Sequence, residues 1–429
     1  MRCLHSSGDK QKLLLKLLRH NFLNVNNVPL ICERTLFVLL VSLCDVTSAR
    51  IFTLTQNPPV KFCYYSYVGE NELVPEAING SLCTHLVYGF ADIVNHTIQP
   101  RDPDTSRAVW HRVVQIKKQF PDLSVLLSVG APPQVFSNTT GSEETLMRLV
   151  ASAAQVIQEF NFDGLDLDWE FPTWNGVLKD RANFIRLLQK LRAAFDGLDR
   201  HRVLLTAAVG GPFTVVEASY DIPDMAKYLD YCLIMGYDFN RYNPLFPFAE
   251  FNSPLFSHQG QVGFFKLLNL EYSSYFWLRG GMPRQKLVVG VPFYGVSFKL
   301  ADPALHGVGA PIDGIGVDDG MVSYGQVCDF LANSTWTSEF HNESRVPFAY
   351  QDRNWISYDD VESIAEKASW IMSHGFAGVM TFDLNNDDFG GRCAASAGRR
   401  FPLQTTVDDV LRNWTDRQKA KFAYAVFGA

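Results

Sequence analysis

Four acidic side chains lie within eight residues of an otherwise apolar stretch, the run FDGLDLDWE at Phe162–Glu170. Three of them, Asp166, Asp168 and Glu170, are spaced two residues apart. Alternate side chains of a β-strand share one face, so these carboxyl groups are expected to project together. Neighbouring carboxylates repel, which raises the pKa of at least one of them, and a carboxyl group that keeps its proton near neutral pH can act as a general acid. The run therefore predicts a catalytic strand.

A solvated acidic edge strand and a cation site are the alternative interpretations of this run. An acidic edge strand would not normally alternate with Leu165, Leu167 and Trp169. Metal sites usually include histidine or loop oxygens, and the run contains neither. We therefore expect no metal and no organic cofactor. By parity Asp163 points away from the other three carboxyl groups, which predicts a structural hydrogen bond at the start of the strand.

The acidic run also carries a resemblance to a known family. Residues 163–170 match, one by one, the signature DGxDxDWE of the glycoside hydrolase family 18 chitinases, and the chain resembles this family over about residues 60–400. Further segments follow in the family's order: CTHLVYGFA at 83–91, LSVG at 127–130, MGYD at 235–238, GVPFYG at 290–295 and GVM at 378–380.

Strand and helix patterns alternate along the chain. Helical spacing is clearest at Glu143–Phe160 and Arg181–Phe195. This alternation predicts a parallel sheet, and eight strands with intervening helices fit an α/β TIM barrel, whose active site lies at the carboxyl ends of the strands. The short apolar runs predict strands at about 62–66, 85–90, 123–129, 162–169, 202–209, 230–236, 287–293 and 377–382.

The predicted domain organisation is built around this barrel. We expect the catalytic barrel at 55–298 and 361–405, a leader at 1–49 and a C-terminal tail at 406–429. The interval 299–360, between the seventh and eighth strands, is longer than an ordinary connection. The resemblance implies that it is a small α+β insertion.

Composition restricts the class of ligand. The 429 residues are 47% hydrophobic, which suffices for a substantial core, and the formal net charge is −7. No basic run accompanies this charge, so nucleic acid is not expected as a partner. A neutral ligand is favoured, and the chain is expected to be a monomer.

Secretion is the predicted localisation. Thr35–Leu43 is a short apolar run followed by small residues that end at Ala49, as in a signal peptide. Its nine residues are too few to span a bilayer, which takes roughly 20, so no stable membrane association is expected. An uncleaved membrane anchor at the N-terminus is the alternative. Glycosylation sequons begin at Asn79, Asn95, Asn138, Asn333, Asn342 and Asn413, mostly in polar loops.

Five of the eight cysteines follow the predicted leader, so at least one of them must remain free. Spacing alone does not determine how the others pair. The resemblance implies the disulfides Cys63–Cys83 and Cys328–Cys393, with Cys232 as a buried thiol on an apolar strand.

The resemblance also implies a mechanism, in which the substrate's own acetamido oxygen is the nucleophile and the configuration is retained. Glu170 would protonate the glycosidic oxygen. Asp168 would orient the acetamido group. Asp166 would lie beneath Asp168 and interact electrostatically with that carboxyl group. Tyr237 would donate its hydroxyl to the acetamido carbonyl, and Asp238 would contact the sugar or the acid from the side.

Two positions depart from the family pattern. Where many members have SxGGW this chain has SVGAP, which ends at Pro132, and Phe382 replaces a tryptophan on the eighth strand. Phenylalanine still stacks on a sugar but has no indole N–H. Trp174 is a candidate substitute platform. The remaining substrate-binding positions that the resemblance implies are Tyr65, Phe90, Gly130, Ala131, Met235 and Met380.

The sequence thus predicts a secreted chitinase acting on chitin or chitooligosaccharides. One alternative is a chitinase-like lectin that binds the sugar without cleaving it. The presence of Glu170 argues against the lectin, and the altered aromatic positions argue for it. A third hypothesis is hydrolysis of the chitobiose core of N-glycans, and the apparent insertion and the order of the segments favour the chitinase over it.

Overall fold

The structure is a computed structural model that describes residues 58–69, 72–101, 107–174 and 176–427. The chain divides into two compact units, Pro58–Arg417 and a second made of Met1–Asn57 with Gln418–Ala429. The predicted leader lies outside the described residues. Of the second unit, only the end of the last helix is described. All that follows concerns the unit Pro58–Arg417.

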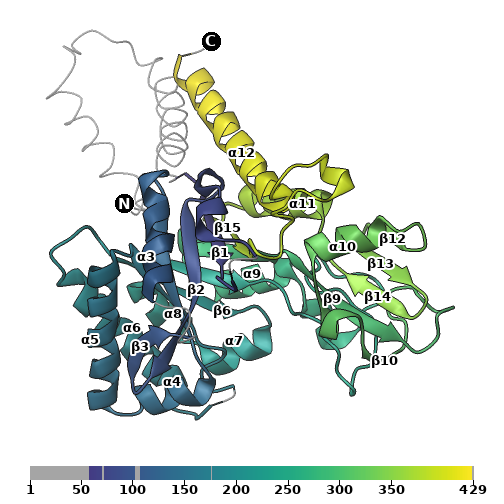
Figure 1. Ribbon diagram of the computed structural model, residues 1–429. Helices are drawn as coiled ribbons and strands as arrows, with labels where there is room; N and C mark the ends of the chain where they lie inside the picture. The colour runs from purple at the N-terminus through teal and green to yellow at the C-terminus, as the bar shows by residue number, and fades with distance from the viewer. Residues whose placement is uncertain (1–57, 70–71, 102–106, 175, 428–429) are drawn as a thin grey trace, which may run out of the picture. The chain divides into compact units, whose positions relative to one another are not determined.

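Eight parallel strands close into a barrel, as predicted. Their order around the barrel is β1, β15, β8, β7, β6, β5, β4 and β2, and a pairing of β1 with β2 completes the ring. Helices surround the strands (Figure 1). The barrel strands are β1 (Val60–Tyr65), β2 (His85–Val94), β4 (Ser124–Gly130), β5 (Gly164–Asp168), β6 (Leu204–Gly210), β7 (Tyr231–Met235), β8 (Leu287–Pro292) and β15 (Gly378–Phe382).

The helices follow the apolar spacing of the sequence. Helix α5 begins after Ser142, whose side chain accepts a hydrogen bond from the Thr145 N–H, and ends before Asn161, which has a left-handed conformation. Its buried side chains recur every three or four residues and face the barrel. The helices are α3 (Arg107–Gln115), α4 (Pro133–Thr140), α5 (Glu143–Phe160), α6 (Asp180–Asp196), α7 (Phe213–Ser219), α8 (Ile222–Tyr228), α9 (Leu270–Arg279), α11 (Val361–Ser373) and α12 (Pro402–Phe427).

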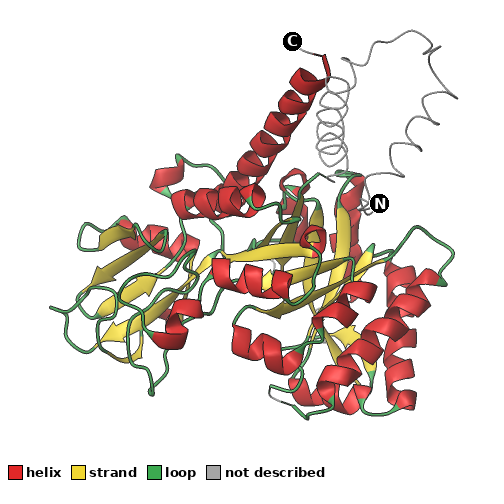
Figure 2. Cartoon of the chain, turned by 180° about the vertical axis from the view of Figure 1, so that it is seen from behind, coloured by secondary structure: helices red, strands yellow, loops and turns green. Residues whose placement is uncertain are grey.

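A second, antiparallel sheet is inserted between β8 and β15, which confirms the predicted α+β insertion. Its order is β10, β9, β14, β13 and β12, and β11 pairs with β9. The cartoon in Figure 2 shows this sheet beside the barrel, with a helix of its own. Its elements are β9 (Tyr294–Leu300), β10 (Ile312–Ile315), β11 (Met321–Ser323), α10 (Tyr324–Leu331), β12 (Thr337–His341), β13 (Val346–Gln351) and β14 (Asn354–Ser357).

Strand β2 is longer than predicted. It continues to Val94 and forms a hairpin with β3 (Thr97–Pro100), which was not predicted. Asn95 and His96 at the turn both have positive φ values. This conformation suits a tight hairpin turn, and asparagine adopts it more readily than most residues.

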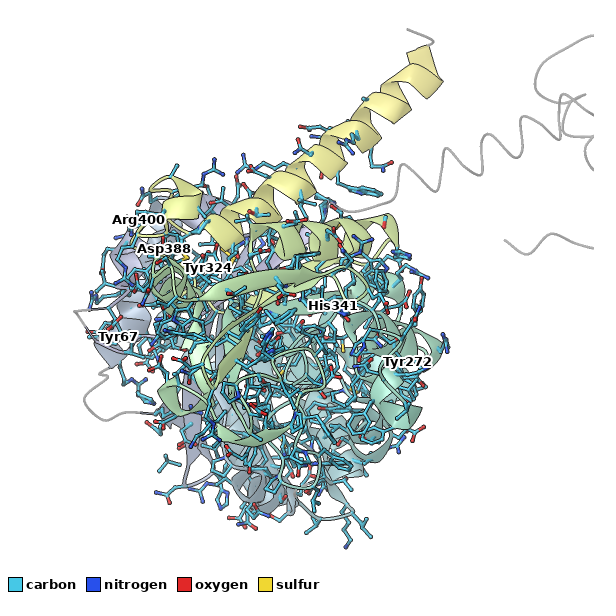
Figure 3. The ribbon with its side chains drawn as sticks, turned by 90° about the vertical axis from the view of Figure 1, so that its right-hand side faces the viewer. Tyr67, Tyr272, Tyr324, His341, Asp388 and Arg400 are labelled. Atoms are coloured by element: carbon cyan, nitrogen blue, oxygen red, sulfur yellow. A yellow bond between two sulfur atoms is a disulfide. The ribbon has the colours of Figure 1, made fainter. Side chains whose placement is uncertain are left out.

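Both disulfides that the resemblance implied are present, Cys63–Cys83 and Cys328–Cys393. Cys232 is a buried free thiol on β7, as expected. Figure 3 labels Asp388, whose carboxylate accepts a hydrogen bond from the Cys393 N–H at 2.7 Å. The second bridge therefore ties the inserted helix α10 to the loop that follows β15. Within the described ranges, no helix is both long and apolar enough to cross a membrane.

Candidate active site

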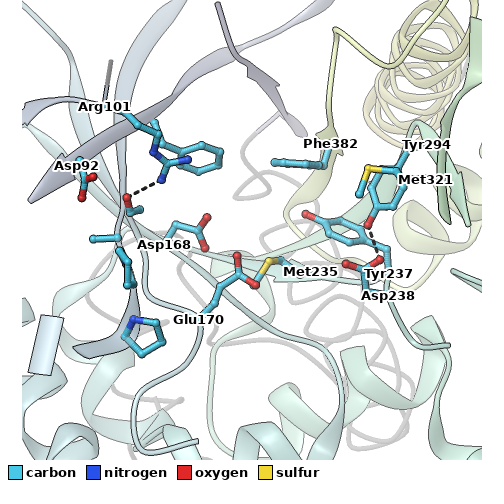
Figure 4. A pocket seen from close by; sticks show the side chains of 15 residues that line it. Asp92, Arg101, Asp168, Glu170, Met235, Tyr237, Asp238, Tyr294, Met321 and Phe382 are labelled. Atoms are coloured by element: carbon cyan, nitrogen blue, oxygen red, sulfur yellow. Dashed lines mark hydrogen bonds between the residues drawn. The ribbon is translucent and has the colours of Figure 1, made fainter. Parts of the chain in front are cut away.

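A cavity of about 530 Å³ opens at the carboxyl ends of the barrel strands (Figure 4). Its walls come from β2, β4, β5, β7, β15 and the inserted sheet. Four of its side chains are carboxylic acids and one is an arginine. The lining residues are Phe90, Asp92, Arg101, Gly130, Ala131, Pro132, Pro133, Asp168, Glu170, Met235, Tyr237, Asp238, Tyr294, Met321 and Phe382.

Asp166 lies inside the barrel, below the cavity. Ser128 on β4 and Thr206 on β6 are its direct neighbours in register, and their hydroxyls donate to its carboxylate at 2.7 and 2.6 Å. Tyr64 donates a third hydrogen bond at 2.7 Å. Burial raises the pKa of Asp166, and the three donors oppose this shift because they favour the charged form. No cation bonds to it within the described chain.

Asp168 is the next inward-facing residue of β5 and reaches the cavity. It is 9% exposed, and its Oδ1 atom has no hydrogen-bond partner among the described residues. Burial raises the pKa of Asp168 well above its ordinary value, and the charges of Glu170 and Asp166 raise it further. Arg101 opposes these effects. Asp168 is thus a buried acid in the cavity wall, with one buried oxygen that lacks a hydrogen bond among the described residues.

Glu170 lies two residues beyond the end of β5, whereas the sequence placed it at the end of the strand itself. Its carboxyl group nevertheless shares the cavity with Asp168, as Figure 4 shows. Burial raises the pKa of Glu170, the charge of Asp238 adds to this rise, and Arg241 opposes it. The group is suited to hold a proton near neutral pH.

Tyr237 and Asp238 follow β7 directly, and both line the cavity. Among the described residues, the hydrogen-bond partner of the Tyr237 hydroxyl is the sulfur of Met380, a weak acceptor at 3.7 Å, so the hydroxyl can bond a ligand more strongly. The Asp238 carboxylate accepts a 2.8 Å hydrogen bond from the Tyr294 hydroxyl and pairs with Arg241 at 3.3 Å. Burial raises the pKa of Asp238.

Comparison with known proteins now decides the family. The pattern of the glycosyl hydrolases family 18 matches residues 60–387. The chain belongs to that family. Mouse chitotriosidase-1 is 35% identical over 332 residues, which are 74% of this chain and 70% of the relative.

Two solved structures extend the comparison with family 18. The Group IV chitinase of Ostrinia furnacalis has a TM-score of 0.77 and 33% identity, covering 82% of this chain and 100% of that one. Human YKL-39, described as a pseudo-chitinase with retained chitooligosaccharide binding properties, has a TM-score of 0.77 and 29% identity with the same coverage. The fold is therefore shared both with a protein named as a chitinase and with one described as a pseudo-chitinase.

Most of the site residues predicted from the sequence meet at the cavity; besides Asp166, which lies below it as expected, three do not line it. Tyr65 is wrong as a substrate contact, because its hydroxyl donates to the Leu73 carbonyl and its ring packs in the core between the barrel and the helices. Its neighbour Tyr64 faces the barrel interior instead. Met380 is fully buried below Tyr237 and does not line the cavity. Trp174 is 49% exposed and also lies outside the lining.

The positions that depart from the family pattern do line the cavity. Pro132 is adjacent to Gly130 and Ala131 in its wall, and Phe382 packs 5.8 Å from the Tyr237 ring. A Cβ atom on Gly130 would lie 3.1 Å from Phe90 and 3.3 Å from Arg101, so a larger residue would fit only if these side chains shifted by a few tenths of an ångström. The wall under Pro132 is therefore tightly filled, and it offers no large aromatic ring.

Sequence reasoning missed five lining residues, of which Pro133 directly follows the noted Pro132. Tyr294 falls in the quoted GVPFYG segment at the start of β9, so its place after a barrel strand could have revealed it. Asp92 and Arg101 lie on or just after the unpredicted β2–β3 hairpin, and Met321 comes from the inserted sheet. No sequence signal indicated these three.

The structural interpretation of Asp163 is confirmed. Its carboxylate accepts the Val125 N–H at 2.8 Å and pairs with Lys117 at 2.9 Å, on the side away from the cavity. Leu165 and Leu167 pack outward against the helices, as parity predicted. No group of histidine, cysteine and acidic residues that could hold a metal occurs in the part of the chain that the structure describes.

Proposed function

We propose that the protein is a secreted chitinase that hydrolyses β-1,4-linked N-acetylglucosamine polymers or oligomers with retention of configuration. The observation that carries the proposal is the pairing of Asp168 and Glu170 in one cavity, with pKa values raised by burial and by their neighbours. Family membership and the related chitinases support the substrate class. No cofactor is required, because the carboxyl groups and the substrate supply the chemistry.

In the proposed first step, Glu170 gives its proton to the glycosidic oxygen while the acetamido carbonyl oxygen of the substrate attacks C1. The C1–oxygen bond to the leaving sugar breaks, and an oxazolinium ion forms. Asp168, which lines the cavity, accepts the acetamido N–H, and its charge then stabilises the cation. Tyr237 can donate to the acetamido oxygen, because its hydroxyl bonds no acceptor stronger than the Met380 sulfur among the described residues.

In the second step, Glu170 takes a proton from water, and the water oxygen attacks C1 from the face that the leaving sugar vacated. The oxazolinium ring opens and restores the acetamido group. Two inversions give net retention. Asp166 lies below Asp168, and its charge raises the pKa of Asp168. The two adjacent acids titrate as a set.

Secretion is part of the proposal. Two disulfides in the described chain fit an oxidising compartment. The asparagines of all six sequons are exposed, although Asn138 and Asn413 lie in helices rather than in loops, and we propose that these sites are glycosylated.

A lectin is the second candidate, because Pro132 and Phe382 reduce the aromatic surface of the cavity and a structural relative is described as a pseudo-chitinase. The deciding test is fluorophore release from a chitobiose glycoside by the wild-type protein and by Glu170→Gln. We expect the variant to lose about 10²- to 10⁴-fold in kcat and to keep its affinity for chitotetraose. Glu144→Gln, an exposed acid on α5, is the matched control and should match the wild type.

The outcomes of this test separate the hypotheses. Binding without turnover by the wild type would refute the hydrolase and leave the lectin. A third hypothesis, cleavage of the chitobiose core of N-glycans, predicts that a high-mannose glycopeptide is cleaved faster than chitotetraose. The chitinase predicts the reverse.

A further inference from the structure

The backbone of Asp238 has an unusual conformation for a residue other than glycine. Its φ angle is 57°, in the left-handed region. Such a conformation is strained, even though aspartate tolerates it better than most residues, and it persists only where neighbouring groups hold it. The carboxylate of Asp238 lines the cavity and interacts with the charge of Glu170. The groups that hold the backbone of Asp238 therefore also affect the position of its carboxylate in the cavity.

Asn252 is the group that holds it. The Asp238 N–H donates to Asn252 Oδ1 at 2.9 Å, and the N–H of the next residue, Phe239, donates to the Asn252 carbonyl at 3.0 Å. Asn252 is 1% exposed and does not line the cavity, so it has no access to a ligand there. Its two acceptors bracket the left-handed residue.

Asn252 is itself fixed by the inserted sheet. Its N–H donates to the Ser357 hydroxyl at 2.9 Å, and its side-chain amide donates to the Tyr294 carbonyl at 3.2 Å. Ser357 ends β14 and Tyr294 begins β9, the strand whose tyrosine hydroxyl also bonds the Asp238 carboxylate. Thus the insertion holds both the backbone and the side chain of Asp238.

Ser253, the residue after Asn252, also holds the backbone of this segment. The Ser253 hydroxyl donates to the Gly236 carbonyl at 2.6 Å and accepts from Lys367 at 3.1 Å. Lys367 is completely buried and pairs with Asp359 at 2.6 Å. Residues 252 and 253 together therefore anchor the backbone on both sides of Tyr237.

We propose that Asn252 is a positioning residue that keeps the Asp238 carboxylate beside Glu170 by bracketing its left-handed backbone, and that it couples the insertion to the reaction. The inference rests on the proposed function. Without Asn252 Oδ1, the Asp238 N–H is buried without a partner and the backbone relaxes toward ordinary φ values. The carboxylate then leaves Glu170.

This movement has a signature in the pH dependence. The charge of Asp238 raises the pKa of Glu170, while Arg241, which pairs with Asp238, opposes that rise. Asp168 and the Tyr237 hydroxyl also face Glu170 in the cavity. When Asp238 moves away, the pKa of Glu170 falls. Glu170 must be protonated for the first step, so the alkaline limb of kcat moves to lower pH.

The test is a double-mutant cycle of Asn252→Ala and Asp238→Gly, in which glycine removes the carboxylate and accepts the left-handed backbone without strain. Each single variant should lose about 10- to 100-fold in kcat/KM, and Asn252→Ala should lower the alkaline limb. Adding Asn252→Ala to Asp238→Gly should cause no further loss. Fully additive losses, or an unchanged limb in Asn252→Ala, would overturn the proposal.

Asn269→Ala is the matched control for stability. Asn269 is also buried, accepts a backbone N–H from Tyr272 at 2.8 Å and donates to the Lys266 carbonyl at 2.8 Å, but it caps α9 away from the cavity. Its variant should lower the melting temperature as Asn252→Ala does and leave the pH profile unchanged. Should Asn252→Ala not fold, Asn252→Ser replaces it, since the shorter hydroxyl side chain cannot reach both partners.

A failure of the proposed function is distinguishable from a failure of this inference. If the wild type does not cleave chitotetraose, the chitinase assignment is refuted, and the same cycle is then measured by the affinity for that oligosaccharide. The positioning role predicts that the losses of affinity in Asn252→Ala and Asp238→Gly are not additive. Additive losses of affinity would overturn it.

Discussion

Thr206→Val is the sharpest test of how Asp166 is held beneath the reaction site. The substitution keeps the shape of the side chain and removes a hydroxyl that donates to Asp166 Oδ1 at 2.6 Å. This oxygen receives its hydrogen bond from Thr206, whereas Oδ2 receives two, from Ser128 and Tyr64. The variant therefore leaves one oxygen of a fully buried carboxyl group without the donor it has in the wild type.

The expected loss of stability in Thr206→Val depends on whether Asp166 is ionised. A hydrogen bond to a charged group contributes about 1.5–3 kcal/mol and one between neutral groups about 0.5–1.5 kcal/mol. The difference raises the pKa of Asp166 further, beyond the rise that burial causes. Because the folded pKa already exceeds the unfolded one, ionisation of Asp166 opposes folding. That cost is absent below the unfolded pKa and complete above the folded pKa.

The loss of stability in Thr206→Val should therefore grow with pH. Below the folded pKa of the wild type, Asp166 is protonated in both proteins, and the loss is that of a neutral hydrogen bond. Above the folded pKa of the variant, the loss reaches about 1.5–3 kcal/mol. Urea unfolding at a series of pH values between roughly 4 and 9 measures it. Ser128→Ala is the control, with a smaller pH-dependent loss because Tyr64 still serves Oδ2. A loss that does not vary with pH would refute an ionised Asp166.

Two further substitutions test the electrostatics. Arg101→Gln removes the cation that lowers the pKa of Asp168, so the acidic limb of kcat should move to higher pH, and a pH–rate profile with an unchanged limb would contradict the role of Arg101. Lys367→Met leaves the fully buried Asp359 without its cation and should reduce the free energy of unfolding by about 3–5 kcal/mol, measured by urea unfolding. Changing Asp359→Leu as well should restore most of the lost free energy of unfolding. A double variant no more stable than Lys367→Met would contradict the explanation that the unpaired charge of Asp359 causes the loss.

Much of the fold could be predicted because the barrel strands are short apolar runs between polar segments. Seven of the eight predicted strands end within two residues of the observed ends, and the exception is β2. In its extension, Ala91–Val94, buried residues alternate with more exposed ones, and Asp92 interrupts the apolar run, so the sequence did not mark this part as strand. The hairpin partner β3 has only one buried residue and gave no signal either.

The carboxylates of the site could be predicted because β5 alternates between acids and leucines, so one face follows directly from parity. The prediction of Tyr65 as a substrate contact was wrong because β1 lacks such an alternation. All six residues of β1 are buried, and the neighbours Tyr64 and Tyr65 are alike in type, so no alternation shows which ring faces inward. Arg101 and Met321 reach the cavity through the hairpin and the inserted sheet, whose placement depends on tertiary packing.

Closure of the barrel by β1 and β15 has a consequence for biosynthesis. The two strands pair in register from Val60 with Gly378 onward, yet most of the chain is translated between them. During synthesis, β1 can pair with β2 early, and the Cys63–Cys83 bridge can form. The other edge of β1 stays unpaired until β15 has been translated. An unpaired strand edge invites association with other chains. A product truncated before β15 would lack Phe382 and keep this open edge, so we expect it to aggregate rather than fold into a smaller barrel.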